Sequence, residues 1–188
     1  MSDDGIVISG GVEYLQPVEK LIPTADPSKR VEPKGVVQPE DLHIFLTERI
    51  LREVVDWSNT DLDHELGGVF VGDLYSHRGM PYLEVAGYIR AAHYRNTAAS
   101  FRFTHDSFSA ISREKEQRFN DRPVVGWHHT HPGYGIFLSG TDMFSHRSFF
   151  NLPWMFAMVV DPRAGTLGFF QWNKGQREVR PCGFFFVR

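Results

Sequence analysis

The sequence predicts an α/β or α+β sandwich, in which helices cover a mixed sheet. Apolar segments of strand length outnumber the amphipathic helical segments, and helices separate several of the strands. The chain has 188 residues, of which 41% are hydrophobic and 14% aromatic, so it can bury a full core. This composition excludes intrinsic disorder, collagen and a coiled coil as the main state.

The first 40 residues are predicted to form a Pro-rich extended arm, and residues 41–188 the domain itself. Five of the chain's 11 prolines fall in the arm: Pro17, Pro23, Pro27, Pro33 and Pro39. Proline fixes φ and removes an N–H donor, so the arm can be neither a continuous helix nor a central strand. Short apolar pieces at 6–8 and 12–15 are typical of strands. We expect the arm to lie on the domain or on a partner.

The elements of the domain follow from apolar runs and from the residues that interrupt them. In chain order, strands are predicted over 42–46, 68–75, 82–92, 100–103, 124–129, 154–160, 167–172 and 179–187, and helices over 47–57, 104–119 and 141–150. Thr47 can cap the first helix, which carries Ile50 and Val54 on one face, and either Thr104 or Asp106 can begin the second. Turn residues at 77–81, a loop rich in Pro and Gly over 132–140, and the turn at 173–175 separate the strands.

Net charge and cysteine content exclude several classes of function. The formal net charge is −3, from 20 Lys and Arg against 23 Asp and Glu, so no basic excess indicates nucleic acid or an anionic membrane. No run approaches the ~18 apolar residues of a membrane span, and the acidic start lacks the basic region of a signal peptide. The single cysteine, Cys182, provides neither an internal disulfide nor a multi-thiolate zinc site. We therefore expect a cytoplasmic protein.

The segment 126–142 contains residues with the chemistry of a metal site. His129 and His131 are two positions apart at the end of a predicted strand, so their side chains point to one side and can converge on one metal ion. Asp142, at the start of the next predicted helix, is the candidate third ligand. Two imidazoles and a carboxylate leave one zinc position open for water, as in catalytic rather than structural sites. The sequence therefore predicts a catalytic Zn²⁺ centre.

Two more residues are candidates for catalysis. Glu65 precedes a Gly-Gly pair and an apolar strand, and it is the best candidate for the base that a hydrolytic zinc site needs. Ser139 precedes the predicted helix, so its hydroxyl is a candidate oxyanion donor, a helix cap, or both. Phe137 is a candidate wall of a substrate groove, with simple packing as the alternative.

The other histidines are expected to lie away from the metal. His128 points to the opposite face of its strand from His129 and His131, which indicates a core or supporting position. His105 and His146 stand near the starts of predicted helices. We expect them at the surface, with a position behind the metal ligands as the alternative.

The sequence resembles the JAMM metalloprotease family, also called MPN+ or JAB. That family has an upstream glutamate, then His-x-His, seven residues, Ser, two residues and Asp. Here His129 and His131, the seven residues 132–138, Ser139 and Asp142 fit this pattern without a gap, and Glu65 with the following glycines resembles the upstream element. The resemblance covers about residues 42–172.

The resemblance implies a cytidine-deaminase-like α-β-α sandwich with a mixed, partly antiparallel sheet. It also implies zinc hydrolysis of an isopeptide or peptide bond after the C-terminal tail of ubiquitin or a ubiquitin-like protein. By this resemblance His129, His131 and Asp142 bind zinc, Glu65 is the base and Ser139 supports the oxyanion. A deaminase is excluded, because it needs a Cys-x-x-Cys pair and the chain has one cysteine.

Short loops refine this expectation. The loop after Asp161-Pro162 contains only residues 163–165, whereas linkage-selective members of the family carry insertions there. In this respect the chain is similar to bacterial members that accompany ubiquitin-like conjugation enzymes. Two alternatives remain open. One is a processing peptidase for a ubiquitin-fold sulfur-carrier precursor, and the other is a catalytically silent MPN scaffold.

Overall fold

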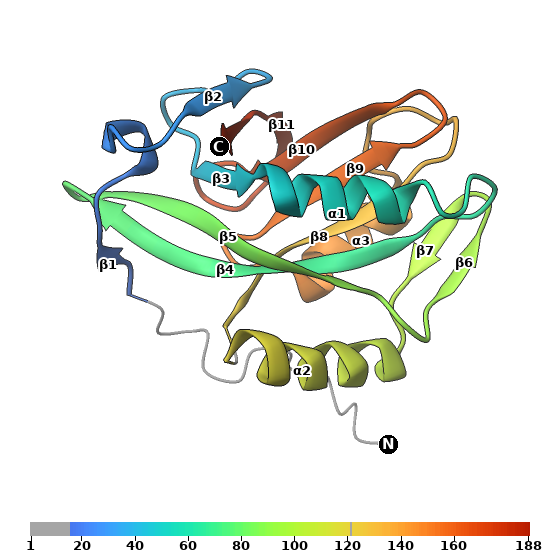
Figure 1. Cartoon of the computed structure of the whole chain (residues 1–188). Coiled ribbons are helices and arrows are strands. Elements are labelled where there is room, and N and C mark those ends of the chain that lie inside the picture. The colour runs from blue at the N-terminus through green and yellow to red at the C-terminus, as the bar shows by residue number, and fades with distance from the viewer. Residues whose placement is uncertain (1–15, 121) are drawn as a thin grey trace.

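The computed structural model describes residues 16–120 and 122–188 (Figure 1). The strands are β1 (Val18–Glu19), β2 (Val31–Lys34), β3 (His43–Thr47), β4 (Gly67–His77), β5 (Met80–Arg90), β6 (Arg95–Thr97), β7 (Ser100–Arg102), β8 (Val124–Thr130), β9 (Phe156–Asp161), β10 (Thr166–Trp172), β11 (Val179–Cys182) and β12 (Phe184–Val187). The helices are α1 (Glu48–Ser58), α2 (His105–Phe119) and α3 (Gly140–Phe149), with a 3-10 turn, η2 (Pro23–Ala25). The strand pieces expected at 6–8 and 12–15 lie outside the described residues.

The strands form one large mixed sheet and one small hairpin. The large sheet has the order β11-β10-β9-β8-β4-β5-β3-β12-β2, with β1 beside β4, and β6 and β7 pair separately. β8 and β9, β3 and β5, and β3 and β12 run parallel, whereas β4 is antiparallel to both β5 and β8. The predicted mixed, partly antiparallel sheet is thus confirmed.

The large sheet curls strongly, because Gly183 alone separates β11 at one end of the strand order from β12 near the other. Across this bend the rings of Phe169 and Phe184 stack with centroids 4.4 Å apart. The single strand expected over 179–187 is therefore wrong. Gly183 breaks it, since its N–H donates to the Val36 carbonyl at 2.7 Å and a Cβ there would lie 2.6 Å from the Lys34 carbonyl oxygen.

Helices cover both faces of the sheet, as expected for an α-β-α sandwich. Ile50 and Val54 of α1 join one apolar core, which includes Phe70 of β4. Phe108 of α2 joins the other core, which includes Trp127 of β8. Figure 1 shows α1 and α2 on opposite sides of the long β4–β5 hairpin. No helix in the described part of the chain is long and apolar enough to cross a bilayer.

The described part of the N-terminal arm lies against the sheet. β2 pairs with β12 as the edge strand and contains Pro33, which fits an edge because proline cannot donate to a neighbouring strand. The Lys20 ammonium donates to the Glu84 carboxylate at 2.8 Å, and the Tyr82 hydroxyl donates to the backbone carbonyl of Leu21 at 3.2 Å. These contacts attach the arm far from the predicted metal ligands.

Local chemistry accounts for several element boundaries. Thr104, rather than Asp106, caps α2 in a reciprocal capping box with Ser107. β4 is longer than predicted, whereas β5 begins and ends two residues earlier. The two strands meet in a two-residue turn, in which Arg78 and Gly79 both have positive φ, as tight hairpins require. The strands β1, β2 and β6 were not anticipated.

Candidate metal centre

The end of β8 presents two histidines on one side of the sheet. His129 is paired across to Gly67 of β4, and the His131 N–H donates to the Val160 carbonyl of β9 at 2.8 Å. Because successive strand residues alternate in direction, His129 and His131 point to the same side. Both rings are buried, with 0% and 2% exposure, and their centroids lie 4.7 Å apart.

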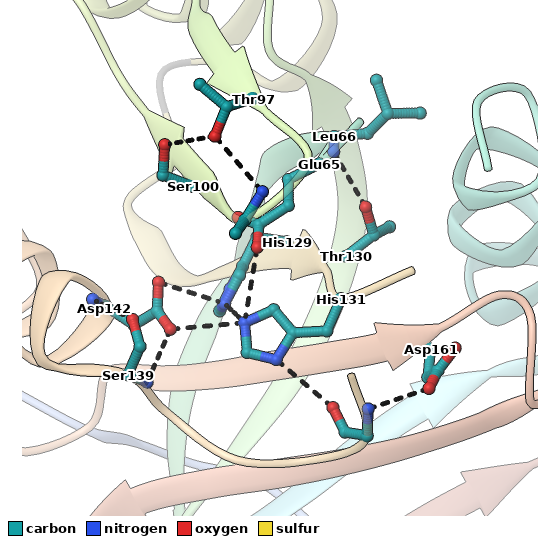
Figure 2. Close-up of polar contacts among 12 residues, drawn as sticks. Glu65, Leu66, Thr97, Ser100, His129, Thr130, His131, Ser139, Asp142 and Asp161 are labelled. Carbon is teal, nitrogen blue, oxygen red and sulfur yellow. Dashed lines mark hydrogen bonds and ion pairs between the residues drawn. The ribbon is translucent and has the colours of Figure 1, made fainter. Parts of the chain in front are cut away.

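The start of α3 supplies the carboxylate. Ser139 is the N-cap residue, and its Oγ accepts a hydrogen bond from the Asp142 N–H at 3.2 Å. In return the Ser139 N–H donates to Asp142 Oδ2 at 2.7 Å. This capping box holds the Asp142 side chain at the first turn of the helix, facing the two histidines (Figure 2).

The three side chains converge closely. The Nε2 atoms of His129 and His131 are 3.0 Å apart. Asp142 Oδ1 lies 3.3 Å from the His129 Nε2, and Asp142 Oδ2 lies 3.3 Å from the His131 Nε2. All three residues are buried, and they form a potential metal-binding group in the described part of the chain.

The donor set and its spacing fit Zn²⁺. Ligand atoms bonded at about 2.0–2.1 Å around tetrahedral zinc lie roughly 3.3 Å from one another, close to the separations found here. Although burial by itself would raise it, the two adjacent imidazoles hold the pKa of Asp142 below its usual range, so the carboxylate is ionised. Burial lowers the pKa of His129, which favours the neutral ring that a metal needs.

Glu65 lies beside this cluster in the loop before β4. Its N–H donates to the Thr97 carbonyl at 3.0 Å, and its own carbonyl accepts from the Asn96 side chain at 2.7 Å, so the β6–β7 hairpin holds it. Glu65 Oε1 is 3.9 Å from the His131 Nε2, whereas Oε2 is buried without a partner. Burial, with a contribution from Asp142 and against the opposing effect of His131, raises the pKa of Glu65 to about 7.

Phe137 borders the cluster on the loop after His131. Its ring lies 4.6 Å from that of His131, and 45% of the residue is exposed. Leu62, Tyr134 and Phe144 are also exposed apolar residues, on the loops and on α3. A groove of about 370 Å³ runs beside the start of α3, lined by Arg102, Phe103, Gly140, Thr141, Phe144, Ser145 and Phe149.

His146 is fully buried, so the expectation that it lies at the surface is wrong. It accepts a hydrogen bond from the Trp127 Nε1–H at 2.9 Å, and burial lowers its pKa to about 4. Trp127 in turn stacks on His129. The position of His146 four residues after Asp142 places it on the same helix face, which is the sequence signal that could have indicated burial.

His128 points to the opposite face, toward α1. Its Nε2 lies 3.0 Å from Ser58 Oγ and its Nδ1 lies 2.9 Å from the Tyr88 hydroxyl. All three side chains are buried, and burial lowers the pKa of His128 far below its usual range. No solvent reaches this chain of hydrogen bonds, so it supports the core. His105, by contrast, is exposed.

Comparison with known proteins connects this site to a family. Residues 40–152, more than half of the chain, match the family described as JAB1/Mov34/MPN/PAD-1 ubiquitin protease. The matched range contains the three clustered side chains, Glu65 and Ser139.

The matches to individual relatives cover less than half of each relative's length. Over 127 residues, 66% of this chain, it is 30% identical to the 26S proteasome regulatory subunit RPN11 of Eremothecium gossypii. Over the same length it is 27% identical to the ubiquitin carboxyl-terminal hydrolase RPN11 of Saccharomyces cerevisiae. This chain spans 40% of the length of both. Over 41 residues, 21% of this chain and 11% of the relative, it is 51% identical to the COP9 signalosome complex subunit 5 of Caenorhabditis elegans.

Proposed function

Because this chain belongs to the JAB1/Mov34/MPN/PAD-1 ubiquitin protease family, we propose that it is a zinc-dependent peptidase or isopeptidase. It cleaves after the C-terminal tail of ubiquitin or a ubiquitin-like protein. The observation that carries this proposal is the buried cluster of two imidazoles and one carboxylate with a second buried acid, Glu65, beside it.

His129, His131 and Asp142 hold the metal in this proposal. Zinc bound by three protein ligands would supply an activated water and would polarise the carbonyl of the scissile bond. The three side chains fit this role because their ligand atoms face one another within one buried space, and none of them extends into solvent.

Glu65 acts as the general base and then the general acid. It takes a proton from the attacking water and delivers it to the amine that leaves. Burial raises the pKa of Glu65 to about 7, so in the metal-free site it is a stronger base than an exposed glutamate, as abstraction of a proton from water requires. The unpartnered Oε2 leaves Glu65 with an acceptor free for water.

Ser139 supports the negative charge that develops on the carbonyl oxygen. Its Oγ accepts from the Asp142 N–H, which leaves the hydroxyl proton available to donate toward the reacting carbonyl. The same capping contact fixes the position of the Ser139 side chain, so the donor is oriented before the substrate arrives.

The substrate is a ubiquitin-like protein or its conjugate, and Phe137 forms part of the wall that receives its tail. The exposed aromatic ring of Phe137 beside His131, with exposed Tyr134 on the same loop and exposed Phe144 on α3, supports binding of an apolar protein surface. The loop between β9 and β10 is short, which favours an insertion-poor enzyme of a bacterial ubiquitin-like system, alongside its conjugation enzymes.

Cleavage assays test this proposal. Ubiquitin-fold proteins carrying either a C-terminal fusion or a lysine conjugate would be incubated with the zinc-loaded protein, with Glu65→Ala as the blank. We expect cleavage after the terminal glycine that the blank lacks. Preference for fusions with one extra residue would instead favour precursor processing. Absence of cleavage, together with zinc well below one ion per chain, would contradict the proposed enzymatic activity and favour the catalytically silent scaffold.

A further inference from the structure

Asp161 is a buried carboxylate that the proposed reaction does not use. It is the last residue of β9 and only 2% exposed. Its Oδ1 accepts the backbone N–H groups of Gly133, Arg163 and Ala164 at 2.9 to 3.1 Å, and its Oδ2 accepts that of Gly135 at 2.9 Å. Although burial raises it, these donors hold the pKa of Asp161 below its usual value, so the group is anionic.

One of these contacts leads directly to a candidate metal ligand. The His131 Nδ1 lies 3.2 Å from the Gly135 carbonyl oxygen. A carbonyl only accepts, so Nδ1 must carry a proton. This leaves Nε2, the ring nitrogen beside Asp142 and His129, as the atom available to bind a metal ion. The peptide N–H of the same Gly135 is held by Asp161. The dashed lines in Figure 2 follow this path from the His131 ring to Asp161.

The loop between these residues needs such a support. Gly133 and Gly135 have φ values of +82° and +84°, in the left-handed region that favours glycine. These conformations turn both N–H groups toward Asp161, which is the acceptor common to the two glycines. Without that acceptor, two glycines would leave the loop and its carbonyl free to move.

The other imidazole of the cluster has no equivalent support. The His129 Nδ1 is buried and has no hydrogen-bond partner. The Gly135 carbonyl therefore orients the His131 ring by a hydrogen bond, whereas the Nδ1 of His129 has no such partner. Asp161 holds the Gly135 peptide, so the orientation of His131 depends on Asp161.

We propose that Asp161 is a positioning residue of the metal centre, which fixes the tautomer and orientation of His131 through the backbone of Gly135. This inference rests on the proposed zinc site. Asp161 contacts neither metal nor substrate, and its effect passes through the loop 132–135. Its other two bonds hold the turn of Arg163, whose side chain donates to the Leu62 carbonyl at 2.9 Å in the loop before Glu65.

Zinc affinity tests this role separately from activity. Asp161→Asn keeps the size of the side chain but replaces one acceptor oxygen with an amide that cannot accept an N–H. In the full chain, titration of Zn²⁺ against a chromophoric chelator should show affinity about 10–100-fold weaker than wild type. The matched control is Asp41→Asn, since Asp41 is also buried and accepts a backbone N–H, from Gln38, away from the cluster. Its affinity should equal that of wild type.

A second variant checks the path. Arg163→Ala leaves the backbone contacts of Asp161 with Gly133 and Gly135 in place, so zinc affinity should stay at the wild-type value. Wild-type affinity in Asp161→Asn, or an equal loss in Arg163→Ala, would overturn the proposal. Wild-type protein that binds no Zn²⁺ would instead overturn the metal centre itself, which makes the two failures distinguishable.

An observation on the unmodified chain covers the case in which Asp161→Asn fails to fold. In zinc-loaded wild-type protein, proton NMR should show a slowly exchanging His131 Nδ1–H with a cross-peak to the loop at Gly135. A protonated Nε2, or a ring N–H in fast exchange with water, would contradict the positioning role.

Discussion

The indole ring of Trp127 lies flat against the imidazole of His129, with centroids 4.5 Å apart and planes 10° from parallel. The other contacts of Trp127 hold it in place, since its N–H donates to His146 and its ring stacks on Phe150. Because the His129 Nδ1 lacks a hydrogen-bond partner, stacking is what orients this ring. The two imidazoles of the cluster are thus supported by different forces.

Trp127→Leu should weaken zinc binding, because the stacking surface behind His129 is lost. We expect affinity to fall by about 10-fold and unfolding free energy by about 2–3 kcal/mol. Phe45→Leu is the control, since Phe45 is also buried and stacks on Phe185. It should lose stability but not zinc affinity. Chelator competition and urea unfolding of the metal-free protein measure the two quantities, and equal affinities would contradict the role of stacking.

Glu65→Gln should separate metal binding from turnover. The amide is isosteric but cannot accept a proton from water, so we expect turnover to fall by about 10²–10⁴-fold while zinc stays bound. Removing a buried carboxylate with an unpartnered oxygen should not reduce stability. Glu84→Gln changes another glutamate with a buried, unpartnered oxygen, on β5, and should retain turnover. Cleavage assays measure turnover, and metal analysis measures bound zinc. Loss of zinc from Glu65→Gln would show that Glu65 is a metal ligand rather than the general base.

Local patterns in the sequence were sufficient for most of the fold. The alternation of His129 and His131 on a strand, and the cap position of Ser139 three residues before Asp142, are short-range features. Strand and helix geometry set the directions of these side chains, and the fold places them together. The order of apolar runs also predicted helices covering a mixed sheet, and the family resemblance implied the α-β-α arrangement.

Long-range contacts account for what the sequence did not reveal. The break at Gly183 depends on the carbonyl of Val36, which lies far away in the chain. The burial of His146 depends on Trp127, and the role of Asp161 depends on backbone N–H groups of another loop. No periodicity or spacing encodes such partners, because they meet only after the sheet has curled.

His146 should make stability sensitive to acid. Burial lowers its pKa from 6.5 to about 4, so the folded protein binds fewer protons here than the unfolded chain. The stability it contributes is present above pH 6.5 and is lost as the pH falls toward 4, by roughly 3 kcal/mol in all. We expect His146→Leu to flatten the dependence of unfolding free energy on pH across this range. An unaltered slope in His146→Leu would disprove the assignment.

Ser139→Gly should distinguish the two roles of Ser139. Glycine is nearly as good an N-cap as serine, so the free energy of unfolding should fall by only roughly 0.3 kcal/mol. The hydroxyl donor is lost, however, and turnover should fall by about 10²-fold if it stabilises the oxyanion. Thr104→Gly removes the equivalent side chain from the capping box of α2, away from the cluster, and should leave turnover unchanged. Unfolding curves and cleavage rates of both variants give the answer. Equal turnover in Ser139→Gly and Thr104→Gly would show that Ser139 serves only as the cap of α3. A loss of turnover confined to Ser139→Gly is the result expected if the hydroxyl acts on the substrate.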